Sequence, residues 1–183
     1  MNTAAFVLFL VAFLPYVWAI ISGSADPSPI SWGIWASVDT LALLAMRKKQ
    51  APIGQISGAV VGASVVTILA LIYGTPTMGS IEWVSVVGAV VGIVLWQVSG
   101  NATLAIISSQ AATFIAAFPT FARGYSNPAQ EDPLAWTIWL VSCVCALLAV
   151  RKWNLEEALQ PISFTVIEAI MVILVVIIPH WPW

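Results

Sequence analysis

Charged residues are scarce in this chain: Asp, Glu, Lys and Arg together make up 8% of its 183 residues. Hydrophobic residues make up 61%, whereas soluble domains contain roughly 45–50%. A single soluble core of this size does not need so much apolar surface. The composition therefore excludes an ordinary soluble domain and predicts an integral membrane protein whose main partner is the lipid bilayer.

Residues that support metal, nucleotide or nucleic-acid chemistry are equally rare. The one histidine is His180, and the two cysteines are Cys143 and Cys145. No Cys/His cluster is present for zinc, and no GxxxxGK loop is present for phosphate. Two cysteines two residues apart on a helix point in different directions, so they cannot form an ordinary disulfide. We expect no cofactor, no metal and, with six Lys and Arg in all, no nucleic-acid partner.

Seven apolar segments divide the chain. Roughly 20 apolar residues span a bilayer, and polar or Pro/Gly-rich interruptions separate the segments. The segments cover residues 4–22, 30–47, 53–73, 81–98, 102–122, 133–151 and 157–178. An odd number of crossings places the termini on opposite sides. Five basic residues lie on the N-terminal side and only Arg123 on the other, so we predict a cell (inner) membrane protein with a cytoplasmic N-terminus and an outside C-terminus.

An internal repeat becomes visible when the sequence is shifted by 104 residues. Residues 13–48 then align with residues 117–152 without a gap. The identical pairs include Pro15/Pro119, Trp32/Trp136, Trp35/Trp139 and Arg47-Lys48/Arg151-Lys152. Repeats at a fixed offset indicate duplicated units. We predict an all-α protein of seven transmembrane helices: a three-helix repeat over 1–74, a connecting helix within 75–100, and a parallel three-helix repeat over 101–183.

This arrangement resembles the SWEET sugar carriers, the PQ-loop proteins and the bacterial vitamin carriers of the nicotinamide riboside type, which share a three-plus-one-plus-three architecture. The Pro-Gln pair of the PQ-loop proteins is absent, since Pro15 and Pro119 are followed by other residues. A WxxW motif lines the substrate pocket of the vitamin carriers. The same motif occurs here at Trp32/Trp35 and at Trp136/Trp139. The resemblance implies a facilitator or coupled carrier that holds its substrate between the two repeats near mid-membrane.

Asp39 shares one helix face with two tryptophans. At 100° per residue, Trp32 and Asp39 point within about 20° of each other, and Trp35 lies about 60° away. A charged side chain that faces hydrocarbon costs at least ~2.5–3.5 kcal/mol, so this face should point into the bundle. By the repeat, the same holds for Trp136 and Trp139. The alternative for the tryptophans is an interfacial aromatic belt.

Three further residues are candidates for substrate binding. Glu168 lies near the middle of the last segment, and an intramembrane ionisable residue is a functional hypothesis by default. Its alternative role is that of a protonated structural donor. Asn101 and Ser109 lie on a polar stripe of the fifth segment, which suits either substrate hydrogen bonds or hydrogen bonds between helices.

Prolines and glycines within the segments have structural interpretations. Pro15 and Pro119 each remove a backbone hydrogen bond, so they predict either hinges or fixed kinks. Gly54, Gly58 and Gly62 have a strict four-residue spacing, which predicts close helix packing.

The charged residues Arg123, Glu131 and Asp132 flank a loop, and we expect them to be solvated.

Two function classes remain open from the sequence. The first is a carrier for a small polar molecule that works by alternating access, and aromatic walls suit either a sugar ring or a flat heteroaromatic vitamin. The second is a non-transporting sensor or assembly partner on the same scaffold, with a homo-oligomer allowed by either. We do not expect the chain to be an enzyme, because Asp39 and Glu168 are the only residues that could serve as a catalytic acid and base.

Overall fold

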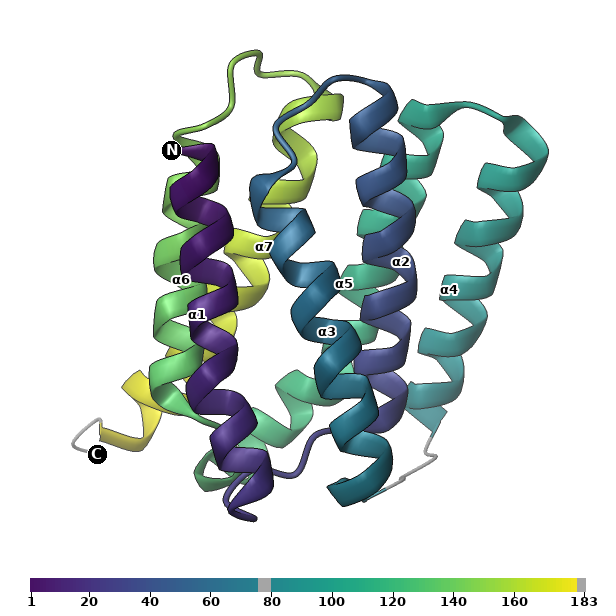
Figure 1. Cartoon of the computed structure of the whole chain (residues 1–183). Helices are drawn as coiled ribbons and strands as arrows, with labels where there is room; N and C mark the ends of the chain where they lie inside the picture. Colours follow the sequence, from purple (N-terminus) through teal and green to yellow (C-terminus); the bar gives the residue numbers. More distant parts are fainter. Residues whose placement is uncertain (76–79, 181–183) are drawn as a thin grey trace.

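The computed structural model describes residues 1–75 and 80–180, and every regular element in these ranges is helical (Figure 1). The α-helices are α1 (Asn2–Ile21), α2 (Pro29–Lys48), α3 (Gly54–Tyr73), α4 (Ser80–Ser99), α5 (Ala102–Ser126), α6 (Pro133–Leu147) and α7 (Leu155–Val172). The short elements are η1 (Pro128–Gln130), the π-helical η2 (Ile173–Ile177), which continues α7, and η3 (Ile178–His180). Among the described residues, five helices are long and apolar enough to cross a membrane, namely α1, α2, α3, α5 and α7 with η2. Their length and composition indicate a multi-pass membrane protein.

Two predicted segment ends differ from the structure by four residues. The sixth segment was predicted to reach residue 151, but α6 ends at Leu147. The chain then turns, with backbone hydrogen bonds that span three residues instead of four, and the Glu157 carboxylate accepts the backbone N–H groups of Arg151 and Lys152. At the other end of the bundle α5 continues to Ser126, past the predicted residue 122.

Side-chain caps explain where several helices begin. Ser28 caps α2 by accepting a hydrogen bond from the Ser31 N–H at 3.3 Å, and Asp132 caps α6 by accepting from the Ala135 N–H at 2.7 Å. In both helices a proline follows the cap. A short polar cap satisfies a free N–H group of the first turn, and proline fits that turn because it has no N–H to satisfy.

The helices pack into two three-helix bundles. In the N-terminal bundle α3 contacts both α1 and α2, and in the C-terminal bundle α7 contacts both α5 and α6. The bundles meet through α1 with α6 and through α2 with α5, while α4 packs on α5 and α2. The chain start and the loops after α2, α4 and α6 lie at one end of the molecule (Figure 1). We call this the basic end, because it carries Arg47, Lys48, Lys49, Arg151 and Lys152.

Close packing of α3 on α1 confirms the interpretation of the spaced glycines. A methyl group on Gly62 would overlap the ring of Phe13, and one on Gly54 would overlap the backbone of Asn2. A methyl group on Gly58 would lie 3.2 Å from the carbonyl oxygen of Phe6. Glycine at these positions lets the two helix backbones approach closely.

Candidate functional site

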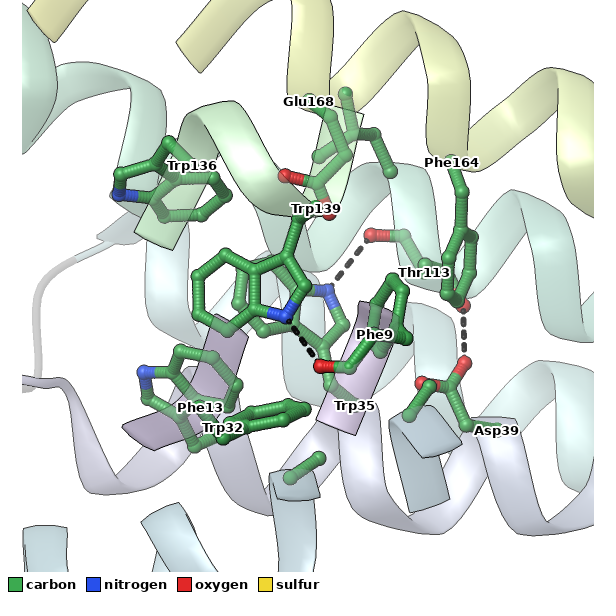
Figure 2. Close-up of a pocket in the computed structure, with 13 residues that line it drawn as sticks. Phe9, Phe13, Trp32, Trp35, Asp39, Thr113, Trp136, Trp139, Phe164 and Glu168 are labelled. Atoms are coloured by element: carbon green, nitrogen blue, oxygen red, sulfur yellow. Dashed lines mark hydrogen bonds between the residues drawn. The ribbon is translucent and has the colours of Figure 1, made fainter. Parts of the chain in front are cut away.

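A pocket with mostly aromatic walls lies where the two bundles meet (Figure 2). The residues that line it are Phe9, Phe13, Trp32, Trp35, Asp39, Ala59, Ala63, Thr113, Trp136, Trp139, Phe164, Ile167 and Glu168. They come from six helices, three in each bundle. The atom-free space of the pocket is about 430 Å³, with the solvent at its mouth included. Only about 40 Å³ of this space can hold the centre of a water molecule. In this conformation the pocket has room for a few waters.

The four tryptophans form two similar pairs. The rings of Trp32 and Trp35 meet edge to face with centroids 5.0 Å apart, and those of Trp136 and Trp139 do the same at 5.1 Å. Trp32 and Trp139 join the pairs, with centroids 6.1 Å apart. Such edge-to-face contacts stabilise a rigid aromatic cluster. The predicted tryptophan face thus points into the protein interior.

Two equivalent hydrogen bonds connect the bundles at this pocket. The Trp35 Nε1–H donates to the carbonyl oxygen of Thr113 at 3.1 Å, and the Trp139 Nε1–H donates to the carbonyl oxygen of Phe9 at 3.1 Å (Figure 2). Both the donors and the acceptors are separated by 104 residues, the offset of the sequence repeat. Each WxxW helix therefore binds the first helix of the opposite bundle.

A third indole N–H group is also engaged. The Trp136 Nε1–H donates to Oε2 of Glu131 at 3.0 Å. Three of the four tryptophans thus use their polar atoms for structural contacts. What they offer to the pocket is ring carbon and π-surface.

Polar groups in the pocket are few and incompletely paired. Asp39 and Glu168 are 3% and 6% exposed. The Thr113 hydroxyl donates to Oδ1 of Asp39 at a long 3.5 Å, and Oε2 of Glu168 has no hydrogen-bond partner. Both carboxyl groups line the same pocket. None of the residues described as lining the pocket is basic.

The structure brings together six of the eight predicted binding residues and leaves two outside. Trp32, Trp35, Asp39, Trp136, Trp139 and Glu168 all line the pocket. Asn101 is exposed and caps α5 by accepting from the Thr103 N–H at 2.9 Å. Ser109 is buried, but its hydroxyl donates to the carbonyl oxygen of Ile106 at 2.9 Å. The polar stripe of α5 therefore caps and packs the helix.

The two proline positions do not interrupt their helices. Pro15 lies within α1 and Pro119 within α5, and each helix is continuous through the proline. A hinge role for either residue stays a prediction.

Seven lining residues were not anticipated from the sequence: Phe9, Phe13, Ala59, Ala63, Thr113, Phe164 and Ile167. Phenylalanine is as suitable for lipid contact as for a pocket wall, so composition alone does not distinguish the two. The repeat offset carried a usable signal for one pair, because Phe9 and Thr113 are 104 residues apart.

Cys143, at the position equivalent to Asp39, contributes to a buried polar chain instead of the pocket wall. The Gln55 Nε2–H donates to its Sγ at 3.0 Å, and the Gln160 Nε2–H donates to Oε1 of Gln55 at 3.0 Å. This chain connects α3, α6 and α7. The two bundles are therefore chemically unequal around the site.

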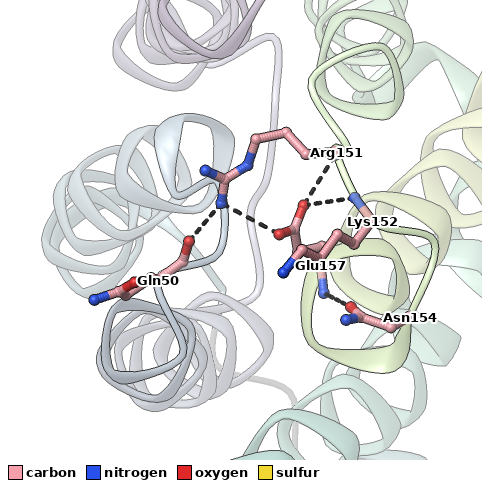
Figure 3. A network of polar contacts seen from close by, with 5 residues as sticks. All are labelled: Gln50, Arg151, Lys152, Asn154 and Glu157. Atoms are coloured by element: carbon pink, nitrogen blue, oxygen red, sulfur yellow. Dashed lines mark hydrogen bonds and ion pairs between the residues drawn. The ribbon is translucent and has the colours of Figure 1, made fainter.

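A polar cluster joins the bundles at the basic end (Figure 3). The Arg151 guanidinium donates to the carbonyl oxygen of Gln50 at 2.5 Å and pairs with Glu157 at 3.2 Å. Beside this cluster, Lys49 of the N-terminal bundle pairs with Glu156 of the C-terminal bundle at 3.6 Å. These contacts hold the loop after α2 against the start of α7.

At the end of the molecule opposite the basic end, Arg123 and Glu131 pack against other residues, so the prediction that they are solvated is wrong. Glu131 is only 7% exposed and accepts the Trp136 N–H, while the Arg123 Nη1–H donates to the carbonyl oxygen of Asp26 at 2.8 Å. Burial raises the pKa of Glu131 from 4.5 to about 7, and the Trp136 hydrogen bond and the Arg123 charge offset only part of that effect. Asp132 caps α6. A loop acid thus belongs to the packed end of the bundle.

Comparisons with known proteins assign no function to this site. No family model, curated protein or solved structure matches the chain. The resemblance to the SWEET, PQ-loop and vitamin carriers stays a prediction. The residues of the pocket and their chemistry are therefore the basis for a functional proposal.

Proposed function

We propose that the chain is a membrane carrier for a small polar molecule, which it moves by alternating access between two parallel three-helix repeats, 1–74 and 101–183. The observation that carries this proposal is the pocket between the bundles, held by the two equivalent tryptophan hydrogen bonds. Binding at the interface of repeats is the arrangement by which many transporters expose one site to either side. The connecting helix lies within 75–100.

The contact pattern of the helices supports the repeat. Adding four to each helix number converts the contacts of α1 and α2 with α3 into those of α5 and α6 with α7. The contact of α1 with α6 corresponds in the same way to that of α5 with α2. Such a pattern fits two units related by an axis along the membrane normal.

Contacts at the two ends suggest how access alternates. At the basic end Arg151 and Lys49 each bridge the bundles, and at the other end Arg123 reaches Asp26 across the same boundary. With both sets formed and the pocket narrow, the two bundles are held together at both ends. Release of one set with retention of the other opens the pocket to one side, and rocking of the bundles exchanges the sides. We assign the basic end to the cytoplasm.

A reconstituted transport assay tests this proposal. Purified protein in liposomes is tested against labelled sugars, nucleosides, vitamins and organic amines for saturable uptake. Trp32→Ala should abolish uptake, whereas the matched control Trp153→Ala, at a tryptophan that is 71% exposed, should retain it. Uptake that survives replacement of all four pocket tryptophans contradicts the site. Binding without uptake favours the sensor alternative, and absence of both overturns the proposal.

A further inference from the structure

The carboxyl groups in the pocket have fewer hydrogen-bond donors and positive charges around them than buried carboxylates need. Asp39 receives one long hydrogen bond from Thr113, and Oε2 of Glu168 receives none. Arg and Lys, the residues that commonly neutralise buried carboxylates, occupy positions 47–49, 123 and 151–152, at the two ends of the bundle. A buried carboxylate without a partner is costly. Protons or a cationic ligand would neutralise these carboxyl groups.

This pocket offers few hydrogen-bond partners to a neutral, hydroxyl-rich ligand. A sugar needs several donors and acceptors around its ring, and buried hydroxyls without partners cost free energy. Three of the four indole N–H groups are already used. The polar lining consists of two carboxyl groups and the Thr113 hydroxyl, which already donates to Asp39.

A cation with an apolar body meets the same surfaces favourably. Aromatic faces attract cations, tryptophan most strongly, and cages of such rings recognise substituted ammonium groups. Carboxylates next to the cage neutralise the ligand charge. The pocket combines these elements, because Trp32, Trp35 and Trp139 lie in the same cavity as Asp39 and Glu168.

We infer that the pocket binds a small organic cation, a substituted ammonium or a flat heteroaromatic cation, with its charge near Asp39 and Glu168 and its apolar body against the tryptophan rings. The inference rests on the proposed carrier function, for which it names the substrate class. It also decides between the two ligand types that aromatic walls allow, in favour of a charged, largely apolar molecule over a sugar. The narrow pocket widens as the bundles move to admit it.

Paired probes of equal shape test the charge requirement directly. Choline and its neutral carbon analogue 3,3-dimethylbutan-1-ol are titrated against the protein in detergent, with tryptophan fluorescence and calorimetry as readouts. We expect choline to bind at least tenfold more tightly, a difference of ~1.4 kcal/mol. N-methylpyridinium tests the flat class in the same way against toluene. These comparisons use the native chain, so they do not depend on the folding of any variant.

Isosteric variants then locate the charge. Asp39→Asn and Glu168→Gln should each weaken choline binding at least tenfold and leave binding of the neutral analogue unchanged. Asp132→Asn removes the same charge at the opposite end, outside the pocket lining, keeps a capping side chain for α6, and should leave choline binding intact. Equal binding of choline and its neutral analogue, or equal effects of all three variants, overturns the inference.

Uptake into liposomes separates this inference from the function on which it rests. Tryptophan-dependent uptake of a neutral sugar that organic cations do not inhibit overturns the cation assignment and leaves the carrier function standing. Choline binding at the pocket without movement of any solute overturns the carrier function and leaves the cation site standing. Absence of both binding and uptake overturns both.

Discussion

A methyl group placed at Gly62 should distort the aromatic pocket from behind. Its carbon would overlap the ring of Phe13, whose centroid lies 4.8 Å from that of Trp139 and 6.0 Å from that of Trp32. The ring must move by about 2 Å to regain ordinary van der Waals contact at about 3.5–4.0 Å. Overpacking of this kind costs ~1–3 kcal/mol, and replacement of a helical glycine returns up to ~1 kcal/mol. Gly62→Ala should therefore lower the free energy of unfolding by ~1–2 kcal/mol.

Gly33 provides the matched control on α2. A methyl group there would lie 3.7 Å from Cγ2 of Thr67, an ordinary contact, so Gly33→Ala should leave stability unchanged or raise it by up to ~1 kcal/mol. The measurement is thermal unfolding of both variants in the same detergent, with tryptophan fluorescence as a second readout. Gly62→Ala alone should alter the emission of the native protein. Equal stability and unchanged emission for the two variants would refute the packing geometry around Phe13.

Further predictions concern the contacts between and around the bundles. Trp35→Phe and Trp139→Phe each leave one buried carbonyl without its indole donor, and each should cost ~1–3 kcal/mol; losses that differ by more than about 2 kcal/mol in denaturant titrations would argue against equivalent roles. The raised pKa of Glu131, about 7 against 4.5, means that its folded form holds a proton more tightly. Its contribution to stability is complete below pH 4.5 and is lost as pH rises through 7, by at most ~3 kcal/mol. Melting temperatures from pH 4 to 9 should therefore decline less in Glu131→Gln than in the native chain, and parallel curves would contradict the assignment. Arg151→Ala should change stability by under ~1 kcal/mol because its side chain is 63% exposed. Glu157→Ala should cost ~1–3 kcal/mol in the same titration because it frees two backbone N–H groups; an equal cost for both would contradict the role of Glu157 as the acceptor of the turn.

Helical periodicity predicts much of this site, because a carboxylate in an apolar helix indicates which face of that helix points into the protein interior. Asp39 is costly in lipid, so the residues that share its face, Trp32 and Trp35, were expected to point inward, and they do. The repeat extended the same expectation to Trp136 and Trp139, which also line the pocket. Charge and spacing thus suffice where one face of a helix carries a group that lipid excludes.

The remaining features depend on packing that no local pattern encodes. Phe9 and Phe164 line the pocket because of how α1 and α7 cross the other helices, and no charged residue within three positions of either one marks its face. Glu131 lies in a loop, where a charge is normally solvated, and becomes buried because Trp136 reaches it from α6. Asn101 has the polarity of a binding residue but lies at a helix start, where the same amide is an effective cap.

The most direct test of the central claim is uptake of one labelled solute, measured over a range of concentrations, by liposomes that contain the native chain, Trp32→Phe or Trp153→Phe. All three proteins are first matched for folding by size-exclusion profile. A carrier whose substrate passes through the tryptophan pocket predicts uptake by the native chain and by Trp153→Phe, with at least a tenfold loss of kcat/KM for Trp32→Phe, equivalent to ~1.4 kcal/mol. Equal uptake by all three proteins would contradict the pocket as the transport site.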